Sequence, residues 1–239
     1  MTTPAPTRTA ARLRWPGQAL VLACIAGLGA PAAGAPPTLP ATAASPAGFV
    51  PAGWQISQQA APDLNRDGRP DAVLLLQPDA PPAPPGTGRS PERVLAVLLA
   101  QRQGWALLAQ NARLVPQVDL ATQEDPLVNG ELEAGKGSFS LALGFTSGVG
   151  SYGSVVLRYR FRLEGTCVRL IGYDRLQTHR ATLDTQDLSV NFLTGAVLHT
   201  DGNAQGDATS KRRARLAANP RRCLPELDSA VSFAPLGPP

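Results

Sequence analysis

The sequence predicts a mainly β fold: a curved antiparallel sheet, either propeller-like or arranged as a sandwich, with few short helices. Apolar and polar residues alternate with period two over 138–145 and again over 155–163, which is the pattern of half-buried antiparallel strands. Shorter apolar runs, such as 93–100 and 105–109, are separated by glycine-containing turns. These observations predict a single β-rich domain over 49–225.

The first strands are expected soon after the start of this domain. Trp54 and Ile56 predict its apolar beginning, and the run 72–76 has strand character. Residues 93–100 read as a buried strand that forms a hairpin with 105–109, although Ala and Leu also favour a helix there.

Two connectors separate these strands from the second half of the domain. The segment 78–91 holds six prolines, so we expect an extended surface connector. Residues 111–135 carry scattered acidic residues without a ligand spacing, and we expect them to form mostly loop.

The second half carries the clearest strand pattern. One face of the first predicted strand holds Phe139, Leu141, Leu143 and Phe145. Apolar residues alternate with arginines over 155–163, and Glu164-Gly165 turns the chain into a further strand over 167–173. Segments 188–193 and 196–200 are predicted to form a compact hairpin around Thr194-Gly195.

The loop 63–71 carries the candidate metal site. Its positions 1, 3, 5 and 9 are Asp63, Asn65, Asp67 and Asp71, and the carbonyl of Arg69 stands at position 7. Ca²⁺ takes six to eight oxygen ligands, so this spacing predicts a calcium loop that turns sharply at a glycine. Position 12 is a leucine rather than a bidentate glutamate, which excludes an EF-hand.

Together with the strand that follows it, this loop resembles the FG-GAP/VCBS repeats of integrin-α-like β-propellers, over roughly residues 54–77. The resemblance implies a structural Ca²⁺ ion between strands. Arg66 and Arg69 flank the carboxylates and should weaken the site. The alternative is a turn that caps itself with side-chain hydrogen bonds and binds nothing.

The N-terminal residues 1–32 read as a signal peptide, with three arginines before an apolar stretch that is too short to span a bilayer. Cys24 follows a weak lipoprotein-like phrase, so lipid attachment is the lesser alternative to a periplasmic or secreted protein. Residues 33–48 predict a disordered Ala/Pro-rich tether, and 226–239 an irregular tail. No transmembrane helix is expected in the mature chain.

Removing the leader lowers the formal net charge of +4 by its three arginines, to about +1. A nucleic-acid partner is therefore unlikely on composition. The densest basic cluster, 211–222, reads either as a solvated segment or as an attachment point for anions. Two cysteines remain, Cys167 and Cys223, and an even pair in an exported protein predicts one disulfide.

A second resemblance is to an uncharacterised family of exported bacterial proteins. It is carried by the loop, the segment 125–127, the phrase 170–174 and the phrase 190–195, in that order. The chain departs from the pattern at 147–153, where such proteins often carry tryptophans. The family implies no established activity.

The expected function is a non-catalytic, calcium-stabilised binding or envelope module, whose partner is an unidentified protein or envelope component. No GxSxG motif is present, and His179 and His199 show no ligand or catalytic spacing. A periplasmic hydrolase with a site not recognisable from sequence remains the alternative.

Overall fold

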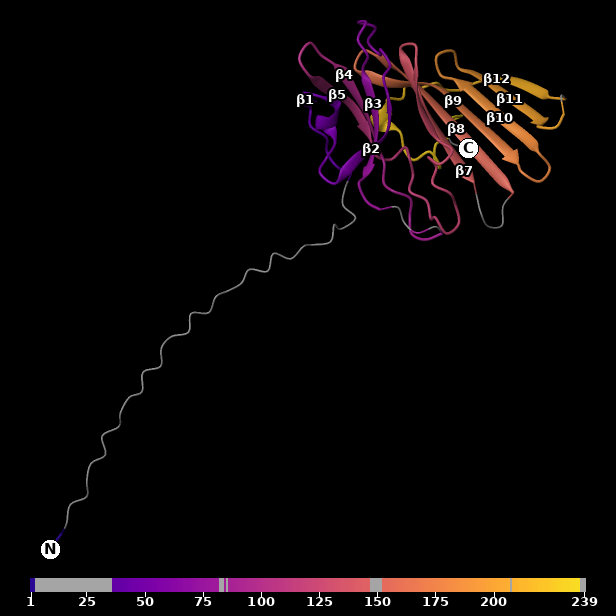
Figure 1. Cartoon of the computed structure of the whole chain (residues 1–239). Coiled ribbons are helices and arrows are strands. Elements are labelled where there is room, and N and C mark those ends of the chain that lie inside the picture. The colour runs from indigo at the N-terminus through magenta and orange to yellow at the C-terminus, as the bar shows by residue number, and fades with distance from the viewer. Residues whose placement is uncertain (3–35, 82–83, 85, 147–151, 207, 237–239) are drawn as a thin grey trace. The chain divides into compact units, whose positions relative to one another are not determined.

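The computed structural model describes residues 1–2, 36–81, 84, 86–146, 152–206 and 208–236. In the part from residue 36 onward, the described residues form two antiparallel sheets with two short 3-10 helices (Figure 1). The prediction of a mainly β fold is confirmed. The expected signal peptide lies outside the described residues, apart from Met1 and Thr2, and so does Cys24.

The first sheet has five strands in the order β1-β5-β4-β3-β2. Its strands are β1 (Thr42–Ala43), β2 (Trp54–Ala60), β3 (Ala72–Pro78), β4 (Val94–Ala100) and β5 (Trp105–Asn111). Residues 93–100 thus form a strand rather than the alternative helix, and β4 pairs with β5 as the predicted hairpin.

The second sheet has seven strands that follow the chain in order from one edge to the other. They are β6 (Glu131–Gly135), β7 (Ser138–Thr146), β8 (Gly153–Glu164), β9 (Cys167–His179), β10 (Asp184–Asn191), β11 (Ala196–Asn203) and β12 (Ser210–Arg215). The predicted hairpin around Thr194-Gly195 is confirmed as β10 and β11. The end of the expected loop 111–135 differs from the prediction, because 131–135 pairs with β7 as an edge strand.

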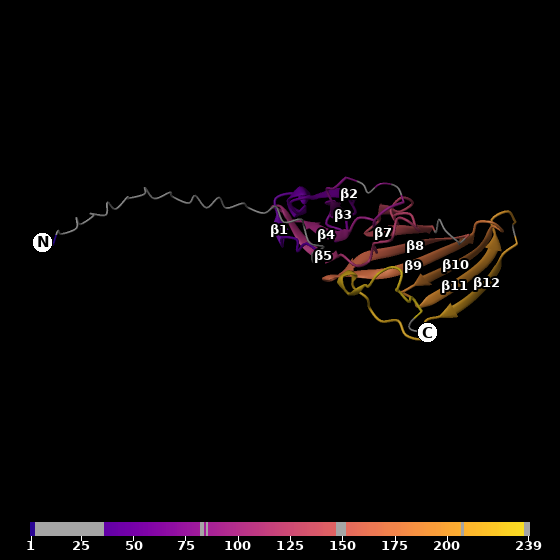
Figure 2. The same cartoon turned by 90° about the horizontal axis from the view of Figure 1, so that it is seen from below.

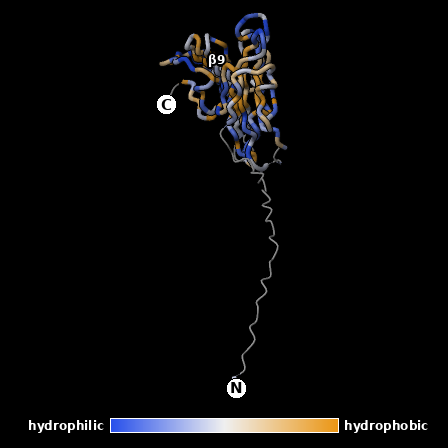
Figure 3. Tube along the Cα trace, turned by 90° about the vertical axis from the view of Figure 1, so that its left-hand side faces the viewer, coloured by the Kyte–Doolittle hydropathy of each residue, from blue (hydrophilic) through white to orange (hydrophobic). Residues whose placement is uncertain are grey.

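The two sheets share one hydrophobic core. Alternate residues of β7 and β8, including Leu141 and Tyr159, face the same core as Val73 and Val97 of the first sheet. Figure 2 shows the strands of the second sheet as a long curved layer, and Figure 3 shows hydrophobic and hydrophilic positions alternating along the trace. Two sheets around a common core favour the sandwich over the propeller-like alternative.

The segment between residues 36 and 50 covers the other face of the first sheet. Leu39 and Phe49 pack with Leu74, Leu76 and neighbouring residues in a second apolar cluster. The 3-10 helix η1 (Pro46–Phe49) follows β1, whose residues pair with Trp105 and Ala106. The prediction of a disordered tether over 33–48 therefore differs from the structure over 36–48, because the outer face of β3 and β4 is apolar and needs a cover.

The C-terminal segment is irregular but packed. Helix η2 (Leu224–Glu226) buries Leu224, and Leu227 and Ala230 join the shared core. Asn111 at the end of β5 donates hydrogen bonds to the carbonyl oxygens of Leu224 and Leu227, at 2.7 and 2.9 Å. The described part of the predicted tail is thus attached to the first sheet.

A disulfide joins Cys167 at the start of β9 to Cys223 just before η2, as the cysteine count predicts. The bond lies beside a backbone bridge between Arg169 and Cys223. By chain entropy, closing a loop over a separation of 56 residues stabilises the fold by about 4 kcal/mol. The disulfide therefore holds the C-terminal segment against the second sheet. No helix within the described ranges has the length and apolar character needed to cross a membrane.

We predict that Phe49→Ala destabilises the protein by about 3–5 kcal/mol, because a fully buried aromatic ring is lost from the second cluster. Denaturant unfolding followed by fluorescence measures the change. Val50→Ala, a half-buried neighbour, serves as the control and should cost much less. If Phe49→Ala costs no more than this control, the segment is not a structural cover.

Candidate functional site: the loop 61–71 and its adjoining pocket

The loop 61–71 joins β2 to β3 and turns where the sequence predicts. Gly68 has φ +83°, the left-handed conformation expected for this glycine. Arg66 also lies in the left-handed region, with φ 60°, although it is not glycine. This conformation costs a non-glycine residue on the order of 1 kcal/mol, so the surrounding loop must hold Arg66 in place.

Three predicted ligands gather around backbone amides at the centre of the loop. The amide of Asp67 donates to Oδ1 of Asp63 at 3.1 Å and to Oδ1 of Asn65 at 3.0 Å. The amide of Gly68 donates to Oδ2 of Asp63 at 3.0 Å. The side-chain oxygens of Asp63 and Asn65 therefore lie close together, because they accept from the same N–H group.

Asp67 is bonded to Arg69 by both its carboxylate oxygens. Its Oδ1 accepts from the Arg69 amide at 2.9 Å, and its Oδ2 forms an ion pair with the Arg69 guanidinium at 2.6 Å. The hydrogen bond from the Arg69 side chain, followed by the one from its backbone amide, holds the pKa of Asp67 below its ordinary value. Asp67 is therefore a carboxylate at neutral pH, with an arginine beside it.

Asp71 has a structural role that the sequence pattern did not indicate. Its side chain is 1% exposed, and its two oxygens accept hydrogen bonds from the amides of Leu64, at 2.8 Å, and Ala100, at 2.9 Å. The carboxylate thus ties the loop to the end of β4. As a metal ligand, Asp71 stays a prediction.

The loop oxygens meet only part of what a hard cation requires. Within the described part of the chain, no three His, Cys, Asp or Glu side chains lie close enough to hold a metal ion. Asp63, Asn65 and Asp67, with the Arg69 carbonyl, provide a donor set of the right chemistry for Ca²⁺. Binding would require the Arg69 guanidinium to release Asp67, whereas Asp71 is already used by two amides.

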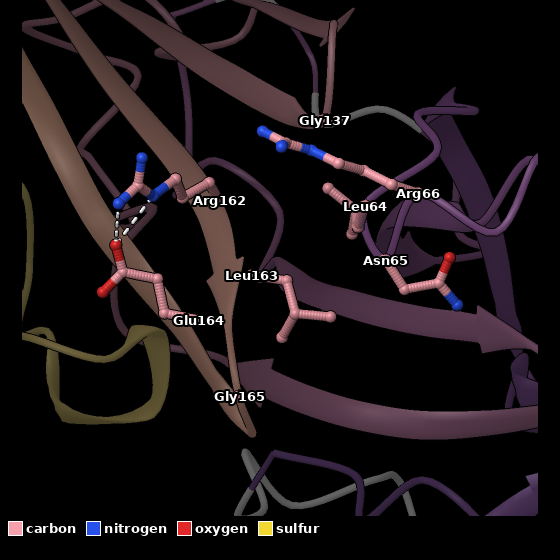
Figure 4. Close-up of a pocket in the computed structure, with 8 residues that line it drawn as sticks. All are labelled: Leu64, Asn65, Arg66, Gly137, Arg162, Leu163, Glu164 and Gly165. Carbon is pink, nitrogen blue, oxygen red and sulfur yellow. Dashed lines mark hydrogen bonds and ion pairs between the residues drawn. The ribbon is translucent and has the colours of Figure 1, made fainter.

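A pocket of about 530 Å³ lies against this loop. Its lining comes from the loop and from two hairpin turns of the second sheet, and consists of Leu64, Asn65, Arg66, Gly137, Arg162, Leu163, Glu164 and Gly165. Figure 4 shows the Arg66 side chain extending towards Gly137, and Arg162 paired with Glu164. A second hollow, of about 580 Å³, lies on the other side and is also lined by Arg66 and Gly137.

Glu164 is the only carboxylate among the residues that line the first pocket, and two arginines hold it. Its Oε2 accepts from Arg169 at 2.8 Å, and its Oε1 pairs with Arg162. The hydrogen bond from Arg169, followed by that from Arg162, lowers the pKa of Glu164. A carboxylate held in this way is a poor proton donor at neutral pH and a weak base.

The pocket is therefore suited to binding rather than to acid–base chemistry. Its side chains offer guanidinium donors, and none of its lining residues is a serine, cysteine or histidine. Elsewhere, Nδ1 of His179 lies 2.9 Å from the Thr182 hydroxyl, which donates to Asp184 at 2.6 Å. The hydroxyl stands between the other two groups and its proton is directed to Asp184, so the imidazole is not placed to activate it.

Sequence reasoning found the loop but missed the rest of this site. Arg66 was identified only as a charge that weakens calcium binding, and Arg162, Glu164 and Arg169 were assigned to alternating strands. The Glu164-Gly165 turn was visible in the sequence. That it lies beside a loop one hundred residues away depends on how the two sheets pack.

We predict that Asp71→Ala destabilises the protein by about 3 kcal/mol in chelator, since two buried amides lose their charged acceptor. Asp71→Asn keeps one acceptor oxygen and should cost less. Denaturant unfolding of both variants, with Asp63→Ala as a loop control, measures the order. An Asp71→Ala variant as stable as the wild type would contradict the structural role.

Comparison with known proteins does not identify a family. No protein-family model, no curated protein and no solved structure matches the chain. The resemblance to FG-GAP/VCBS repeats thus rests on the residues of the loop alone.

Proposed function

We propose that the protein is an exported, non-catalytic binding module of the cell envelope or the space outside it, stabilised by Ca²⁺ in the loop 63–71. The observation that supports it most is the pocket beside the loop. Its volume of about 530 Å³ lies in the range of ligand sites, and its one lining carboxylate is neutralised by arginines. Such a lining can hold an oxygen-rich group of a partner.

In this proposal the loop holds Ca²⁺ through Asp63, Asn65, Asp67 and the Arg69 carbonyl, with water completing the shell. The bound ion supplies positive charge among carboxylates that would otherwise repel one another. Asp71 contributes by anchoring the loop to β4, whether or not it also contacts the ion. An ordered loop in turn fixes Arg66, which separates the two hollows.

Export favours this proposal because calcium outside the cytoplasm is abundant enough to occupy a weak site, with a dissociation constant of ~10⁻⁴–10⁻³ M. A weak site is expected here, since Arg69 competes with the ion for Asp67. The loop is exposed at its centre, so the ion can enter without unfolding of the core.

We predict that Ca²⁺ raises the melting temperature of the protein. An ion that binds only the folded state stabilises it by about 1.4 kcal/mol at a tenfold excess over the dissociation constant. Asp67→Ala should abolish this gain, whereas Asp79→Ala, an exposed acidic residue of the next connector, should retain it. Identical melting curves in millimolar Ca²⁺ and in chelator would remove calcium from the proposal.

The hydrolase alternative makes the opposite forecast on activity. We expect no turnover of ester, peptide, phosphate or glycoside substrates by the purified protein, with or without Ca²⁺. Substrate turnover that disappears on His179→Ala or Thr182→Ala would replace the binding module with an enzyme. Turnover unaffected by both substitutions and by Glu164→Gln would point to a contaminant.

A further inference from the structure

Strand β12 forms the free edge of the second sheet. It pairs with β11 on one side, and among the described residues no strand pairs with its other side (Figure 1). All six of its residues are exposed. A free edge presents unpaired backbone N–H and C=O groups, which is a template for pairing with another extended chain.

This edge carries four cations within five residues: Lys211, Arg212, Arg213 and Arg215. The register places Lys211, Arg213 and Arg215 beside Thr200, Leu198 and Ala196, on the face away from the core. Arg212 lies on the opposite face, beside His199. An added strand would therefore meet positive charge on both of its faces.

These four cations have no carboxylate partner within the described ranges. The Arg215 guanidinium donates to the carbonyl oxygen of Thr194 at 3.3 Å. The contrast is with Arg158 and Arg160 on the same face of the sheet, which pair with Glu133 and Asp174. Positive charge is thus neutralised in the middle of this face and left open at the β12 edge.

A hollow of about 510 Å³ adjoins the edge on the same face. Its lining includes Arg213, Arg215, Ser189 and Asn191. The Oδ1 of Asn191 accepts from the amides of Leu193 and Thr194, so the polar group left to face a ligand is the amide donor. The hollow offers donors and cations, which are complementary to carboxylates.

Protection of the edge against pairing and binding of nucleic acid account less well for its basic residues. Lysine and arginine on an edge strand discourage pairing with further sheets, but they repel only neutral or basic strands and not acidic ones. A single-stranded nucleic acid would be expected to stack its bases on aromatic side chains, and none lines the hollow.

We propose that β12 binds an acidic, extended segment of a partner protein by strand addition. The partner's backbone pairs with the free edge, and its carboxylates lie opposite Lys211, Arg213 and Arg215, with one side chain reaching the hollow. This interaction is independent of the calcium loop and of the function proposed for it.

The test uses a fluorescein-labelled octapeptide of alternating Thr and Glu, titrated with the purified protein at low salt and followed by anisotropy. We expect Arg213→Ala/Arg215→Ala to weaken binding at least tenfold, and the matched control Arg158→Ala to change it less than twofold. The same peptide with alternate backbone nitrogens methylated keeps its charge but loses donors along one edge, and should also bind at least tenfold more weakly.

Three outcomes would overturn the proposal. Binding unchanged in the double variant would remove the β12 cations from the interaction. Equal binding of the methylated peptide would show charge attraction without strand pairing. A heparin fragment or an oligothymidylate of matched charge that binds as tightly as the peptide would assign the edge to polyanions in general. Unchanged melting temperatures of the variants confirm that the fold is intact.

Discussion

Strands β3 and β4 are buried on both faces, and the rest of the structure is arranged to meet this constraint. Successive side chains of a strand point to opposite faces, so a run such as Val73 to Leu76 needs two apolar partners rather than one. The second sheet covers one face. The N-terminal segment with Leu39 and Phe49 covers the other, and the C-terminal segment fills the remaining part of the shared core.

Charged groups follow from where this packing leaves them. Arg93 at the start of β4 is nearly buried, and it pairs with Asp125 at 2.9 Å; burial lowers its pKa, and the nearby Asp125 carboxylate opposes that shift. Asp71 is buried but bonded to two amides. Arginines on the outer face of the second sheet pair with acids near its centre, and those at β12 do not. Buried charge is compensated, as desolvation requires, and uncompensated charge lies where water reaches it.

The two places with binding potential differ in origin. The pocket beside the loop 61–71 exists because a loop of the first sheet meets two hairpin turns of the second. The β12 edge exists because the second sheet ends there without closing on the first. The first depends on the relative placement of both sheets, whereas the second is a property of one strand and its register.

The sequence by itself determined the strands of the second sheet, the hairpins and the self-bonded turn around Asp63 and Asp67, because each follows from period-two patterning or from residues close in the chain. It also indicated the cysteine pair through the even count. Only the tertiary structure decided that residues 36–48 cover a sheet, since Ala/Pro-rich composition does not reveal a distant apolar face. It likewise decided that Asp71 braces β4 and that Arg66 lies beside the Glu164 turn. These are contacts between segments far apart in sequence, and local patterns carry no information about which faces will meet.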